Sequence, residues 1–85
     1  MINEFILKEF GNRIRQLRIE KNLSQEGLSE LTGFHRTYIG MIERGERNIS
    51  LTHIVVFAKV FDLNLSELLI LSNSNYKDYN TKKQI

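Results

Sequence analysis

The sequence contains no cysteine and no proline, and only 5 of its 85 residues are glycine. Without cysteine the chain can form neither disulfides nor thiolate zinc sites, so its stability must come from packing. Without proline, long stretches can be helical with no internal breaker. These absences favour an all-α fold.

Long apolar segments and a strong net charge are also missing. No apolar run approaches the roughly 20 residues of a transmembrane helix, and the N-terminus lacks the charged and apolar regions of a secretory signal. We therefore expect a cytoplasmic protein without a membrane partner. A composition of 41% hydrophobic and 26% charged residues is typical of one globular domain, and the net charge of +2 favours an anionic partner only weakly.

The first predicted helix covers residues 3–21. Phe10, Ile14 and Leu17 follow the spacing i, i+4 and i+7, which places their side chains on one face of a helix. Asn22 suits the end of this helix, because asparagine tolerates the positive φ that is common there.

A second predicted helix covers residues 25–32. Ser24 is a good N-cap for it, and Gly33 is a good stop. Its apolar positions, Leu28 and Leu31, are expected to face the first helix.

A third predicted helix, residues 36–44, follows a tight turn at 33–35 and stops at Gly45. Its apolar residues are Tyr38, Ile39 and Ile42. Two helices joined by a short turn with glycine are typical of a helix-turn-helix, in which the second helix enters the major groove of DNA.

Two further helices complete the predicted domain. Ser50 caps the fourth, whose core positions are expected to be Leu51, Ile54, Phe57, Ala58 and Phe61. The fifth opens with the capping-box spacing of Asn64 and Glu67, and contains Leu65, Leu68 and Leu69. We expect one domain over residues 1–71, followed by a polar, flexible tail at 72–85.

Several short motifs lie along the predicted helices and loops: Leu-Ser-Gln-Glu at 23–26, Gly33, Ile-Glu-Arg-Gly at 42–45, Arg47 with Asn48, and Leu-Ser-Glu-Leu-Leu at 65–69. Together they resemble the lambda-repressor-like (Cro, phage-repressor and Xre) DNA-binding domains. Within that family, residues 35–48 look most like the controller proteins of restriction–modification systems. Gly27 and Ser29 depart from the family pattern, which usually has Glu and Ala there.

The resemblance implies a compact five-helix domain that regulates transcription as a homodimer. Its partner would be a double-stranded DNA operator with two half-sites related by two-fold symmetry. Two alternatives are an antitoxin-like module that binds a partner protein and represses its own gene, and a small phage-type repressor. We expect no enzymatic activity, no cofactor and no small-molecule ligand. We also expect no metal, since His35 and His53 share no helical face and a surface histidine is the default reading for each.

The early face of the third helix carries the candidates for base readout. Arg36 is the strongest, because a guanidinium binds guanine O6 and N7 together, although it could be a solvated surface arginine. Thr37 and Tyr38 follow, and Tyr38 could instead pack half into the core. Phosphate contacts are expected from Ser24, Gln25, His35, Arg47 and Asn48, of which the resemblance places the last two against the DNA backbone.

Arg18 could form an ion pair with Glu43 or contact a phosphate, and the resemblance favours the structural ion pair. We expect this pair to be exposed, and exposed pairs of this kind contribute only about 0–1 kcal/mol.

Apolar residues outside the predicted core stripe predict a dimer interface through the fourth and fifth helices. They are Val56, Val60, Leu63, Ile70 and Leu71, and the last two are expected to extend the fifth helix. Such a dimer would set two copies of the third helix about 34 Å apart, facing successive major grooves. The alternative is that these residues are scattered on a monomer surface.

Overall fold

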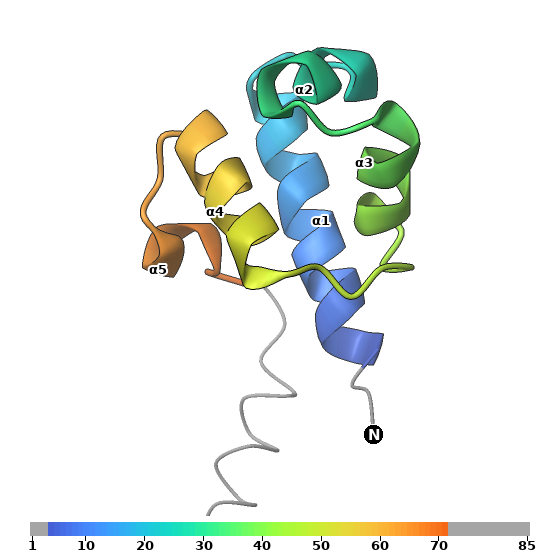
Figure 1. The fold of residues 1–85 in the computed structure, drawn as a ribbon. Helices are drawn as coiled ribbons and strands as arrows, with labels where there is room; N and C mark the ends of the chain where they lie inside the picture. The colour runs from blue at the N-terminus through green and yellow to red at the C-terminus, as the bar shows by residue number, and fades with distance from the viewer. Residues whose placement is uncertain (1–3, 72–85) are drawn as a thin grey trace, which may run out of the picture.

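The computed structural model describes residues 4–71, which form five α-helices and no strand (Figure 1). The helices are α1 (Glu4–Glu20), α2 (Gln25–Thr32), α3 (Arg36–Glu43), α4 (Leu51–Val60) and α5 (Leu65–Leu68). The predicted all-α, five-helix fold is therefore confirmed. Asn3 and the tail at 72–85, which the sequence analysis predicts to be flexible, lie outside the described residues. No helix within residues 4–71 is long and apolar enough to cross a membrane.

The helix ends are set by the residues that the sequence suggests. Ser24 accepts a hydrogen bond from the Gly27 backbone N–H at 2.9 Å, so glycine at this position still allows the N-cap of α2. Asn22 has a φ of 58° and Gly33 a φ of 80°, the positive values that end α1 and α2. Asn64 and Glu67 form the predicted capping box, each side chain bonded to the other's backbone.

One apolar core joins all five helices. It contains Phe10, Ile14, Leu17, Leu28, Ile39, Ile42, Phe57, Ala58, Phe61 and Leu68. Phe57 is fully buried, with its ring centroid 6.4 Å from that of Phe10 and 5.4 Å from that of Phe34. The α4 aromatic side chain therefore connects the long helix α1 to the turn that precedes α3.

Two leucines predicted to be in the core are on the surface instead. Leu31 is 58% exposed, because α2 packs more closely against α3 and α4 than against α1. Leu51 is 68% exposed: it is the first residue of α4, and the core face of this helix begins only about a turn later. Both residues lie on the face that the helical spacing predicts to be apolar. The spacing does not show whether a neighbouring helix is long enough to cover them.

The prediction that Ile70 and Leu71 extend the fifth helix is wrong. The helix ends at Leu68, where the guanidinium of Arg13 on α1 binds its last carbonyls. The Arg13 Nε donates to the Leu68 oxygen at 2.9 Å and the Arg13 Nη2 to the Glu67 oxygen at 2.7 Å. This contact satisfies carbonyls that a helix end leaves without a partner, and it fastens α5 to α1.

We therefore expect Arg13→Ala to destabilise the domain by about 1–3 kcal/mol, the usual range for hydrogen bonds to a charged group. The measurement is the midpoint of urea unfolding. Arg15→Ala, at an exposed position of the same helix, is the control and should leave the midpoint near that of the wild type. Equal midpoints for the two variants would contradict a capping role for Arg13.

Candidate nucleic-acid interface

The turn between α2 and α3 is held by side chains of α2. The Thr32 hydroxyl accepts a hydrogen bond from the Phe34 backbone N–H at 3.1 Å, and the Ser29 hydroxyl donates to the Phe34 carbonyl. Ser29, where the resembled family has alanine, therefore ties the turn to α2. These bonds, together with the packing of Phe34 on Phe57, set the direction in which α3 leaves the turn.

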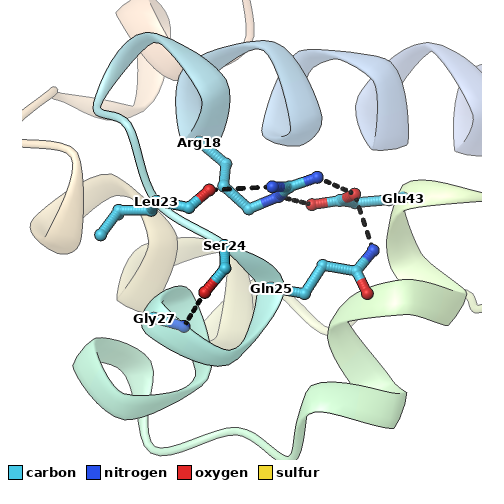
Figure 2. Close-up of polar contacts among 6 residues, drawn as sticks. All are labelled: Arg18, Leu23, Ser24, Gln25, Gly27 and Glu43. Carbon is cyan, nitrogen blue, oxygen red and sulfur yellow. Dashed lines mark hydrogen bonds and ion pairs between the residues drawn. The ribbon is translucent and has the colours of Figure 1, made fainter.

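An ion pair between Arg18 and Glu43 joins α1 to α3 (Figure 2). The Arg18 Nε lies 2.6 Å from Glu43 Oε2 and its Nη2 lies 3.1 Å from Glu43 Oε1. The third nitrogen, Nη1, donates to the Leu23 carbonyl at 2.9 Å. The hydrogen bond to Glu43 raises the pKa of Arg18, so the guanidinium stays charged.

This pair is not exposed, contrary to the estimate from the sequence. The side chain of Arg18 is 12% exposed and that of Glu43 only 4%. The reason is that the loop at Leu23 and the start of α2 close over the pair. Removing one partner would leave a mostly buried charge, which costs far more than losing a surface pair.

The start of α2 is part of the same network. The Gln25 Nε2 donates to Glu43 Oε1 at 3.1 Å, which fixes the side-chain amide of the first residue of α2 beside α3 (Figure 2). An amide nitrogen carries two hydrogens, so the second can still donate to a phosphate. The Ser24 hydroxyl accepts from Gly27 and can likewise donate its own hydrogen.

The first residues of α3 are polar and exposed to solvent. Arg36 and Thr37 are exposed, and the Arg36 Nη1 donates to Glu26 Oε2 at 3.1 Å. His35 caps the helix, because its Nδ1 accepts from the Thr37 backbone N–H at 3.1 Å. The neutral ring then carries its hydrogen on Nε2, which is a suitable donor for a phosphate.

Tyr38 packs between α3 and α4, the half-buried alternative in the sequence analysis. Its ring meets Phe34 and His53 edge-on, at centroid distances of 5.3 Å and 5.5 Å. Its hydroxyl lies 2.7 Å from His53 Nδ1, and the Arg47 guanidinium lies 5.1 Å from its ring centroid. The reading of His53 as a surface histidine is wrong, because Phe34 and Tyr38 cover it.

The candidate dimer residues do not all belong to the surface. Val60 and Leu63 pack against the monomer core, so the core uses them after all. Val56 and Leu71 are half-buried, while Ile70 is 65% exposed. Spacing on α4 cannot separate the two roles, because it does not show how α5 packs against α4.

Three contacts at this candidate interface are not predictable from the sequence patterns. They are the bond from Gln25 to Glu43, the pair of Glu26 with Arg36, and the contact of Tyr38 with His53. Each joins residues 10 to 18 positions apart on different helices. Among residues 4–71, no cluster of three or more histidine or acidic side chains could hold a metal ion.

Comparison with known proteins finds similar chains among transcription control proteins. The helix-turn-helix family profile matches residues 14–68, which begin inside α1 and end with α5. The control protein C.SmaI of Serratia marcescens is 46% identical over 69% of this chain and 70% of its own length. The control protein C.BamHI of Bacillus amyloliquefaciens is 46% identical over 71% of this chain and 75% of its own.

A solved structure supports the same similarity. The restriction-modification controller protein C.AhdI from Aeromonas hydrophila is 48% identical, with a TM-score of 0.70, over 74% of this chain and 96% of its own.

We expect Glu43→Gln to lower the free energy of unfolding by about 2–4 kcal/mol, because it leaves the Arg18 charge mostly buried without its carboxylate. Urea unfolding measures this loss. Glu46→Gln is the matched control: Glu46 pairs with Arg44 on the surface, where the Glu46 side chain is 51% exposed and that of Arg44 58% exposed. Similar losses for the two variants would show that the Arg18 pair behaves as a surface contact.

Proposed function

Because the chain belongs to the lambda-repressor-like helix-turn-helix family, we propose that it is a sequence-specific transcription regulator of double-stranded DNA. We propose further that it acts as a homodimer and controls a restriction–modification operon. The similarity to C.SmaI, C.BamHI and C.AhdI, which extends over most of the helical domain, supports this assignment. Its site of action would be the cytoplasm, and it would act by binding alone, without a chemical step.

One observation carries the proposal: the exposed start of α3 is fixed relative to the start of α2. Gln25 on α2 and Arg18 on α1 both bind Glu43, the last residue of α3. In a docked helix-turn-helix, the start of the second helix meets base edges while the first helix lies across the DNA backbone. The two functions need a constant offset between the helices, and the Glu43 network supplies it.

The side chains divide by the chemistry of their contacts. Arg36 would bind guanine O6 and N7, and Thr37 would offer its methyl to thymine. Tyr38 remains a candidate at the edge of this surface, with its hydroxyl shared with His53. Phosphates would be bound by the donors around the two helix starts and in the loop after α3, namely Ser24, Gln25, His35, Arg47 and Asn48.

The operator is proposed to have two half-sites. A relative, the restriction-modification controller protein C.Esp1396I, was solved as a tetramer in complex with its natural 35 base-pair operator. It is 32% identical to this chain, with a TM-score of 0.69, and the match covers 78% of this chain and 91% of its own. A two-fold dimer of the present chain would place two copies of α3 on successive major grooves.

The test is selection of duplexes from a random pool with the purified protein. We expect enrichment of a sequence with two-fold symmetry, and an affinity that falls steadily with salt as counterions are released. A pool without enrichment, or an affinity that stays constant between low and physiological salt, would overturn the proposed function.

On the selected duplex, Arg36→Ala should weaken binding by about 1–3 kcal/mol and relax the preference at one base pair. Fluorescence anisotropy on the selected and on a random-sequence duplex measures both effects. Gln25→Ala, which removes a proposed phosphate contact, should weaken the two duplexes alike. If Arg36→Ala also weakens both alike, Arg36 binds phosphate rather than a base.

Dimerisation is tested best at Ile70. Burial of its exposed side chain would contribute about 1.5–3 kcal/mol to association, and its replacement does not disturb the core as Val60→Glu would. In sedimentation at micromolar concentration we expect a dimer for the wild type and a monomer for Ile70→Glu. Leu31→Glu, which alters an apolar residue of similar exposure on α2, should still dimerise. A dimeric Ile70→Glu would exclude this residue from the interface.

A further inference from the structure

A charged pair lies on the surface that would face DNA. Glu26, the second residue of α2, accepts a hydrogen bond from Arg36, the first residue of α3. The Glu26 Oε2 and Arg36 Nη1 atoms are 3.1 Å apart, and the two side chains are 70% and 63% exposed. Exposed pairs contribute little to stability. A carboxylate on a surface that binds a polyanion therefore needs another explanation.

We propose that Glu26 is a specificity-determining residue that acts through Arg36, an inference that rests on the proposed function. Glu26 makes Arg36 a poor ligand for phosphates, which are present in every sequence. It leaves Arg36 able to bind a guanine. Its effect is on the ratio of specific to random binding rather than on affinity alone.

The hydrogen-bonding capacity of arginine makes this selection possible. A guanidinium has five N–H groups in a planar fork, and the contact with Glu26 uses only Nη1. Within residues 4–71, Nε and Nη2 of Arg36 donate to no other residue. They can bind guanine O6 and N7 while Nη1 keeps its bond to Glu26. A phosphate bound there would instead bring its negative charge close to the Glu26 carboxylate.

Two other arginines, Arg18 and Arg47, have different surroundings. The mostly buried guanidinium of Arg18 donates hydrogen bonds to Glu43 and to the Leu23 carbonyl. Arg47 lies over the ring of Tyr38 and forms no ion pair within the described part of the chain, so its charge is available to phosphates. Arg44, which follows α3, also pairs with a glutamate, Glu46, but it is not one of the proposed DNA contacts. Of the two arginines proposed to contact DNA, charge compensation therefore falls on Arg36, proposed to read a base, and not on Arg47, proposed to bind the backbone.

The experiment compares Glu26→Gln, Arg36→Ala and the double variant. Glu30→Gln is the matched control, because Glu30 is an exposed carboxylate of the same helix with no hydrogen bond or ion pair to another described residue. Each protein is titrated by fluorescence anisotropy against the duplex selected with the wild type and a random-sequence duplex of equal length. Thermal unfolding of each variant verifies that it folds.

For Glu26→Gln we expect binding to the random duplex to strengthen on the order of 3- to 10-fold. Without the neighbouring negative charge of Glu26, Arg36 can bind a phosphate of any sequence. Binding to the selected duplex should change by less than about 3-fold, so the specificity ratio falls. When Arg36 is already alanine, Glu26→Gln should change the affinity for the random duplex no more than Glu30→Gln does in the wild type.

Two results would overturn the inference alone. One is an equal gain in random binding for Glu26→Gln and Glu30→Gln, which would show a general charge effect. The other is a full effect of Glu26→Gln in the absence of Arg36, which would show direct contact with DNA. If the wild type itself enriches no duplex, the proposed function fails, and the inference fails with it.

Discussion

The mostly buried carboxylate of Glu43 is the point on which the arrangement of the helices depends. This carboxylate, on α3, accepts hydrogen bonds from Arg18 of α1 and from Gln25 of α2. Arg18 also holds the Leu23 carbonyl, so the loop between α1 and α2 is tied to the same group. A charge in this position is tolerated only because its hydrogen-bonding partners are present together. The polar network therefore sets the offset of the helices, while apolar burial supplies the general stability.

A second connection runs from α3 to α4 through aromatic side chains. Phe34 contacts Tyr38, His53 and Phe57, and the Tyr38 hydroxyl bonds to His53. The turn before the proposed recognition helix is thus packed directly on α4, the helix that carries part of the proposed dimer surface. Such contiguous packing leaves α3 little freedom to move relative to that surface. A fixed distance between the two copies of α3 in a dimer requires this rigidity.

The arginines illustrate how little the net charge says about binding. Arg13 binds the last carbonyls of α5, Arg18 binds a buried carboxylate, and Arg36 is compensated by Glu26. These three positive charges thus serve the fold or are balanced locally. The net charge therefore does not indicate which side chains would contact DNA, and under the proposed function the selectivity would come from where individual donors are placed.

The sequence alone determined the helices and most of their ends, because these depend on local chemistry: Ser24 and Asn64 cap helices wherever those helices lie. The end of α5, where Arg13 of α1 binds the last carbonyls, is the exception. It also identified most core positions, since helical spacing places them on one face. Tertiary structure decided which faces are covered. Leu31 and Leu51 fit the spacing but lie beyond the reach of a neighbouring helix, whereas Val60 and Leu63 appeared spare and are used by the core. The pair of Arg18 with Glu43 was expected from the family resemblance, but its burial was not. The partners of Arg13, Gln25 and Arg36 were decided in three dimensions, because each contact joins separate helices whose relative position no local pattern records.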